Sequence, residues 1–188
     1  MRKLVTVLLL GFIPTACSGT NEYKVGDRGP GGGTIVYVAS ESFACGYTMT
    51  SLCKHLEVAP VEAIAMYPWS EDWNTSMEVS GANGSAIGTG WQNTMDIVAQ
   101  GNSDPTKSAA AYAEAYEFGG MTDWFLPSKD ELYEIHEQRV AVAETLGLNY
   151  WSSSDFDLNT SWGTSFNTGY QSRGMKFNAW GSWPVRAF

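Results

Sequence analysis

The stretch Asp123-Trp-Phe-Leu-Pro-Ser-Lys-Asp-Glu-Leu132 predicts the start of a helix. Ser128 and Glu131 have the spacing of a capping box. In that motif the serine hydroxyl accepts a hydrogen bond from the glutamate amide, and the glutamate side chain accepts one from the serine amide. Apolar residues then recur at helical spacing as far as Leu146, and Gly147 is a typical helix stop. We therefore expect a helix from about 128 to 146.

The rest of the chain predicts two more helices and several short strands. The expected helices span 94–100 and 108–118, and the second is followed by two glycines. Short runs of β-branched and aromatic residues between turn signals predict the strands 34–39, 150–153, 161–166, 175–177 and 185–188. We expect Trp124 and Phe125 to pack beneath the 128–146 helix, and the last strand to close the sheet.

The first residues have the pattern of an export signal. Arg2 and Lys3 precede the ten-residue apolar run Leu4–Ile13, which is too short to span a bilayer as a helix. We interpret residues 1–16 as a signal peptide, 17–22 as a polar tether and 23–188 as one domain. Without residues 1–16 the formal charge changes from −9 to −11, which argues against nucleic acid as a partner.

The three cysteines divide into a pair and a single residue. Cys45 and Cys53 enclose a short turn-rich segment, so we expect them to form a disulfide, which an exported protein favours. Cys17 lies where bacterial lipoproteins are cleaved and acylated, although Pro14 stands where leucine is usual. Lipidation of Cys17, simple secretion and an uncleaved anchor therefore remain the three alternatives.

The residues indicate binding rather than catalysis. Neither a nucleophile elbow nor a set of three or four metal ligands with zinc spacing occurs in the sequence. Asp155, Asp157 and Asn159 offer oxygen ligands at alternate positions, but Thr160 and Phe166 replace the glycine and glutamate of a helix–loop–helix calcium site. A non-helical calcium site and a solvated turn remain the two interpretations of this segment.

The tryptophans permit two interpretations. An exposed tryptophan can stack on a sugar ring or a peptide, whereas a buried one builds the core of a small domain. We expect most of the eight to be core residues. The predicted ligand-binding face comprises the loops 155–159 and 172–183, with Arg173 and Trp180 beside Asp155, Asp157 and Asn159.

Six motifs together resemble the bacterial Lcl C-terminal domain family, over nearly the whole of 23–188. They are Tyr23-Lys-Val-Gly-Asp-Arg-Gly-Pro-Gly-Gly-Gly33, Ala44-Cys-Gly-Tyr47, Ala86-Ile-Gly-Thr-Gly90, Asp123–Leu132, Tyr150-Trp-Ser-Ser-Ser154 and Pro184-Val-Arg-Ala-Phe188. The Leu-Pro-Ser helix start also resembles formylglycine-generating enzymes. The resemblance implies an α+β, C-type-lectin-like fold with two to three helices and a small, mostly antiparallel twisted sheet. It also implies that the N- and C-terminal strands pair.

The resemblance carries over the fold but not the chemistry of these relatives. The cysteines of the oxidases have no counterpart in the C-terminal half, and the Glu-Pro-Asn and Trp-Asn-Asp signatures of calcium-dependent lectins are missing. The adhesin of the family has an affinity for sulfated polysaccharide, which the acidity of this domain does not favour.

The expected function is therefore a non-catalytic binding or adhesion module of the bacterial cell envelope or outer membrane, or else a secreted one. It would recognise a glycan or a surface protein and touch the membrane only through a lipid anchor. Two alternatives remain: a carboxylate-dependent envelope hydrolase, and an inert lipoprotein scaffold that forms a homo-oligomer. A pair of facing carboxylates would indicate the hydrolase, and a stable oligomer in sedimentation without ligand would indicate the scaffold.

Overall fold

The structure is a computed structural model that describes residues 22–71, 79, 81–143 and 147–188. The predictions of a signal peptide over 1–16 and of lipidation at Cys17 lie outside the described residues, as does all of the tether except Glu22. Within the described part of the chain, no helix has the length and apolar character needed to cross a membrane.

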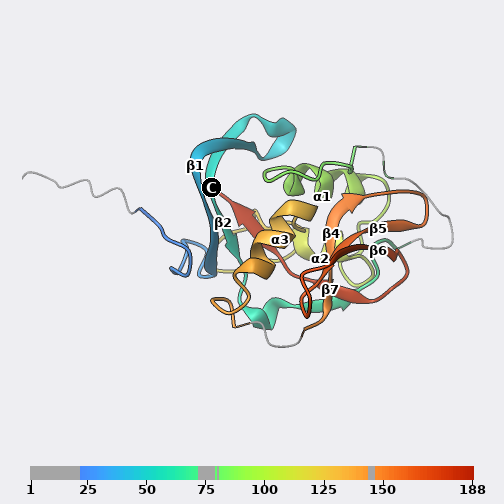
Figure 1. The fold of residues 1–188 in the computed structure, drawn as a ribbon. Helices are drawn as coiled ribbons and strands as arrows, with labels where there is room; N and C mark the ends of the chain where they lie inside the picture. Colours follow the sequence, from blue (N-terminus) through green and yellow to red (C-terminus); the bar gives the residue numbers. More distant parts are fainter. Residues whose placement is uncertain (1–21, 72–78, 80, 144–146) are drawn as a thin grey trace, which may run out of the picture.

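The described part of the chain is α+β, with three helices and two separate sheets (Figure 1). The helices are α1 (Gly90–Ala99), α2 (Ala109–Glu114) and α3 (Lys129–Glu137), and the short 3₁₀ turns are η1 (Tyr47–Met49) and η2 (Val61–Ala63). The strands are β1 (Thr34–Cys45), β2 (Ser51–Val58), β3 (Ala65–Tyr67), β4 (Asn149–Asp155), β5 (Thr160–Ser165), β6 (Gln171–Met175), β7 (Trp180–Ser182) and β8 (Val185–Ala187).

The smaller sheet joins the two ends of the described domain in the order β1-β2-β8. Both pairings are antiparallel, and β8 pairs only with Leu56–Val58 of β2. The expectation that the first and last strands pair is wrong in this detail: β1 occupies one edge of β2, so only the other edge is open to β8. The ends nevertheless meet, because the Tyr23 and Phe188 rings lie 5.6 Å apart.

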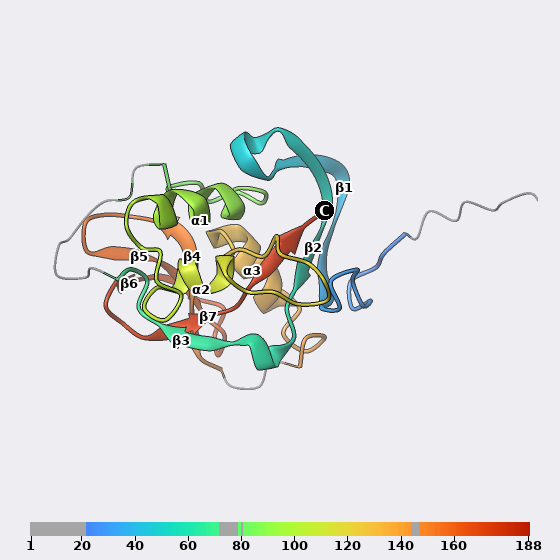
Figure 2. The ribbon, with the colours of Figure 1, turned by 180° about the vertical axis from the view of Figure 1, so that it is seen from behind.

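The larger sheet has the order β3-β7-β4-β5-β6. Its pairings are antiparallel except for the short parallel bridge between β4 and β7. Helix α3 contacts β1 of the smaller sheet as well as β4 and β5 of the larger one, while α1 packs on β4 and α2 on β7. Helix α3 therefore connects the two sheets, as Figures 1 and 2 show from opposite sides. The lectin-like character of the fold stays a prediction.

The capping box at the start of α3 is confirmed. The Ser128 amide donates to Glu131 Oε2 at 2.6 Å, and the Glu131 amide donates to Ser128 Oγ at 3.3 Å. The helix ends earlier than predicted, at Glu137, and turns follow. Val142 of the predicted apolar face is still buried in the main core, but Ala143 has a φ of 57°, outside the helical region, so the chain does not continue as an α-helix there.

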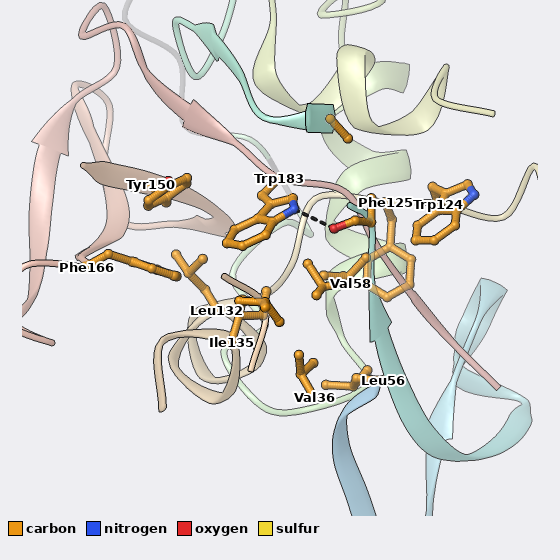
Figure 3. Packing of buried hydrophobic residues seen from close by; sticks show 14 residues of the cluster. Val36, Leu56, Val58, Trp124, Phe125, Leu132, Ile135, Tyr150, Phe166 and Trp183 are labelled. Carbon is orange, nitrogen blue, oxygen red and sulfur yellow. Dashed lines mark hydrogen bonds between the residues drawn. The ribbon is translucent and has the colours of Figure 1, made fainter. Parts of the chain in front are cut away.

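The main core lies where α3, β2 and β8 meet (Figure 3). As expected, Trp124 and Phe125 are buried here with Leu132 and Ile135 of α3. Trp183 lies between the two halves of this core, and its indole N–H donates to the Ala59 carbonyl at 2.8 Å. This bond satisfies the one polar atom of the Trp183 side chain, as is usual for a buried tryptophan, whereas the indole nitrogen of Trp124 in the same core has no hydrogen-bond partner among the described residues.

A second core packs α1 and α2 against the larger sheet. It contains Trp69 and Trp151, whose indole N–H groups donate to the carbonyls of Ser152 and Tyr67 respectively. With Trp124 and Trp183, four of the seven tryptophans in the described residues are fully buried. Trp91 and Trp180 are partly buried and pack against the two cores, so most of the described tryptophans serve the core, as expected.

The Glu131 carboxylate also organises the loop before α1. It has no exposed surface and accepts from the Gly88 amide at 2.7 Å as well as from Ser128. A side chain at position 90 would begin 2.1 Å from Glu131 Oε2, so glycine is required there. Burial raises the pKa of Glu131 to about 7, although the hydrogen bonds from Ser128 and Gly88 oppose this shift.

We expect the raised pKa of Glu131 to make the domain less stable as the pH increases. Below pH 4.5 both states carry the proton; between about 4.5 and 7 the unfolded chain releases it while the folded protein keeps it. Stability therefore falls through this window, by about 3 kcal/mol for this group. Urea unfolding from pH 4 to 8 should show this fall in the wild type and lose it in Glu131→Gln. An identical pH dependence in both proteins would contradict the assignment.

Candidate functional site

A two-stranded arm projects from the smaller sheet. Lys54 and His55 of β2 still bond to the backbone of Phe188, whereas the ends of the two strands, Phe43–Cys45 and Ser51–Cys53, pair with each other. Figure 1 shows the arm bending over toward α1. The predicted disulfide between Cys45 and Cys53 is present at its end, with the two Cα atoms 6.0 Å apart. A loop of this size stabilises the fold by about 2.5 kcal/mol in the chain-entropy model.

The tip of the arm has an unusual backbone. Thr48 and Met49 have φ values of 55° and 57°, a region that costs a residue with a side chain about 1 kcal/mol or more. The Thr48 amide donates to the side chain of Gln92 on α1 at 2.8 Å, and this bond helps to hold the tip in place. The Tyr47 ring meets the Trp91 ring edge to face, with centroids 5.7 Å apart.

A pocket of about 240 Å³ lies between this tip and α1, and we call it the tip pocket. Its walls come from four separate parts of the sequence. They comprise the disulfide and tip residues Cys45, Gly46, Tyr47, Ser51 and Cys53, the α1 residue Trp91, and the residues Asp123, Phe125 and Ala187. An apolar, aromatic lining with a few polar groups is typical of a small-ligand site.

Asp123 is the charged residue of this lining, and Arg186 holds its carboxylate. The guanidinium donates from Nε to Oδ1 at 2.8 Å and from Nη2 to Oδ2 at 2.9 Å, a bidentate geometry that fixes the carboxylate in orientation. The Asp123 side chain nevertheless remains 48 % exposed. Its outer lone pairs are therefore open to a ligand.

Arg186 is shared with a second carboxylate, that of Glu57. Its Nη1 lies 3.2 Å from Glu57 Oε2, and Glu57 has no exposed surface. Glu57 also accepts from the Gly31 and Gly33 amides at 3.0 and 2.7 Å. Burial alone would lower the pKa of Arg186, but its bonds to Asp123 and Glu57 raise it. The guanidinium therefore stays charged at any ordinary pH.

The predicted ligand-binding face is built differently from the tip pocket. Asp155 is buried in an ion pair, with Lys176 Nζ 2.8 Å from its Oδ1. It also accepts from the Ser161 hydroxyl and from the Val79 amide, each at 2.8 Å. The Asp155 carboxylate is thus fully occupied by the protein itself, and its role is structural.

The neighbouring predicted ligands close a turn. Asp157 Oδ1 accepts from the amides of Asn159 and Thr160 at 2.9 and 2.8 Å, which lowers the pKa of Asp157. Asn159 lies exposed in the same turn. Within the described ranges, no three or more His, Cys, Asp or Glu side chains are placed to hold a metal ion. This geometry fits the solvated-turn interpretation of the segment.

Arg173 and Trp180 lie on different surfaces. Trp180 stacks on Trp151 with centroids 4.2 Å apart and covers Gly174, so it belongs to the packing of the sheet. Arg173 is exposed and lies over the Phe156 ring at 4.4 Å. The segments that carry Phe156 and Arg173 expose four large apolar side chains, which we call the sheet-end patch: Phe156, Leu158, Met175 and Phe177.

Sequence reasoning did not predict a ligand site at the tip pocket, although Cys45, Cys53 and Asp123 of its lining lie in the predicted disulfide and in the quoted motifs. Tyr47 and Trp91 carry no chemical motif, and the pairing of Arg186 with Glu57 joins residues 129 positions apart. One available signal was a single charged residue inside each of two apolar strand segments, at Glu57 and Arg186, with opposite signs. Buried opposite charges are expected to pair.

Comparisons with known proteins agree with the motif resemblance. The family model described as the Lcl C-terminal domain matches residues 68–186, which is more than half of the chain. The match includes Trp91, Asp123 and Arg186 but begins after the disulfide arm. No curated protein matches the sequence.

The fold is shared with a solved structure. It is a fimbrial protein from Bacteroides ovatus, with a TM-score of 0.53 and 13 % sequence identity, and the likeness covers 83 % of this chain and 44 % of that one. The chain thus spans less than half the length of the fimbrial protein, and the likeness concerns the fold alone.

Removal of Arg186 should strongly destabilise the protein. Arg186→Met leaves the Glu57 carboxylate buried without a cation, which costs about 3 kcal/mol or more. The matched control is Arg173→Met, an exposed arginine, for which we expect a change within about 0.5 kcal/mol. Urea unfolding of both variants measures the difference. Equal effects of the two substitutions would show that Arg186 is not the required counter-charge.

Proposed function

We propose that this chain, which belongs to the Lcl C-terminal domain family, is a non-catalytic binding module of the surface or adhesion type. Its ligand would be a glycan or protein group held in the tip pocket. The observation that carries this proposal is the aromatic-walled pocket with the half-exposed, orientationally fixed carboxylate of Asp123.

A surface location is part of the proposal. Disulfides persist in oxidising compartments, so the buried Cys45–Cys53 disulfide supports export of this domain. Residues 1–16 also have the pattern of an export signal. The shared fold with a fimbrial protein is in keeping with exposure at the cell surface. Lipid attachment through Cys17 would then tether the domain to a bacterial membrane.

The tip pocket favours binding over hydrolysis. Carboxylate-dependent glycan hydrolysis requires two carboxyl groups about 5 to 10 Å apart on either side of the bond. The described lining of this pocket contains one, Asp123, and that carboxylate is engaged by Arg186. Such a carboxylate can accept a hydrogen bond from a ligand but has no acid partner in the lining.

The sheet-end patch favours one further function, self-association as a scaffold. Exposed large apolar residues in a group are typical of protein interfaces, and β6, at the edge of the larger sheet, contributes Met175 to the patch. In that case sedimentation should show a stable oligomer without ligand, and Phe156→Ser should dissociate it.

Ligand binding by the purified protein should depend on Tyr47. We expect the protein to bind a subset of a glycan array or of cell-surface proteins, and Tyr47→Ala to weaken that binding at least tenfold because a wall of the pocket is lost. The matched control is Tyr170→Ala: Tyr47 and Tyr170 are 63 % and 72 % exposed, so neither substitution should disturb the core.

Three outcomes would count against this proposal. They are the absence of any ligand above background on array and cells, an equal loss in both tyrosine variants, and unchanged binding by Tyr47→Ala. The last result would move the site to another surface, such as the sheet-end patch.

A further inference from the structure

We infer that the tip pocket selects an organic ammonium group. The inference rests on the proposed function, since it names the chemistry of the ligand held in that same pocket. It follows from the balance of charges beneath the pocket, the arrangement of its aromatic walls and its size.

The charges beneath the pocket do not cancel. Arg186 supplies one positive charge to two carboxylates, those of Asp123 and Glu57, so the group retains one negative charge. Glu57 is completely enclosed and bonded to glycine amides, whereas Asp123 reaches the pocket surface. The unbalanced charge is therefore presented to a ligand through Asp123. A phosphate, sulfate or carboxylate would be repelled there.

The walls are of the kind that attract cations. The Tyr47 and Trp91 rings stand at 80° to each other, and Phe125 lies in the same lining. The negative face of an aromatic ring attracts a cation within about 6 Å of its centroid, and several rings around one pocket form the site that binds quaternary ammonium ligands.

A metal cation does not fit this pocket. Metal ions need three or more oxygen, nitrogen or thiolate ligands. Asp123 is the one carboxylate in the lining, and both cysteines are bonded to each other. A soft organic cation needs no such ligand set. The volume of about 240 Å³ suits a group the size of one amino sugar or of the end of a lysine side chain.

The test is calorimetric titration of the full chain with four probes. Tetramethylammonium chloride presents the cation alone, and glucosamine and N-acetylglucosamine differ at the amine, which is charged only in the first. Nα-acetyl-lysine amide presents the same charge on a peptide side chain. All titrations are done at one ionic strength, fixed with sodium chloride, because surface electrostatics are screened by salt.

We expect tetramethylammonium and glucosamine to bind, and N-acetylglucosamine to bind at least tenfold more weakly than glucosamine. Whichever of glucosamine and the lysine amide binds more tightly identifies the carrier of the ammonium group. Asp123→Asn should weaken the binding of each cation at least tenfold. The control is Asp130→Asn, which removes the same charge from α3; the Asp130 and Asp123 side chains are equally exposed, at 48 %.

Two results would overturn the inference while leaving the proposed function intact. One is equal binding of glucosamine and N-acetylglucosamine, which would mark a site for neutral sugars. The other is no binding of any cation by a protein that still binds an array ligand through Tyr47. If Asp123→Asn fails to fold, the comparison of glucosamine with N-acetylglucosamine on the wild type decides. If the protein binds none of the cations and no ligand of the array, both the inference and the proposed function are wrong.

Discussion

Arg186 connects the parts of the molecule that the tip pocket requires. Its guanidinium bonds to the buried Glu57 on β2 and to Asp123 in the segment before α3. Through Glu57 it also supports the glycine-rich loop, whose Gly31 and Gly33 amides donate to that carboxylate. A buried carboxylate without a cation is costly. The last strand is therefore held in register by charge as well as by its backbone pairing with β2.

The opposite wall of the pocket is fixed by different means. Phe43 of the arm packs against the main core, the Cys45–Cys53 disulfide joins its two strands, and the bond from Thr48 to Gln92 holds its tip against α1. The left-handed backbone at Thr48 and Met49 persists under these constraints. Backbone strain of this kind is often found where a ligand is held. The pocket thus combines two sides that are fixed separately. The Arg186 bonds hold the charged side at Asp123, and the arm tip supplies Tyr47 to the aromatic side.

Local signals were readable in the sequence, and long-range ones were not. The α3 capping box joins residues three positions apart and the disulfide joins residues eight apart, so both could be predicted. The α+β class followed from the family resemblance. The pocket joins Tyr47, Trp91 and Asp123 across strands and helices whose arrangement no short motif encodes. The predicted ligand face was recognised from acidic residues, yet Asp155 proved to be paired with Lys176, 21 positions away.

The proposed binding of the ligand in the tip pocket, with Trp91 in its wall, can be tested by an NMR titration. The ¹⁵N-labelled protein is titrated with glucosamine, and the indole N–H resonances of the tryptophans are followed. We expect the Trp91 resonance to shift and saturate, while those of Trp162, which contacts Phe156 of the sheet-end patch, and of the buried Trp183 stay in place. A saturating shift at Trp162 with none at Trp91 would contradict this proposal.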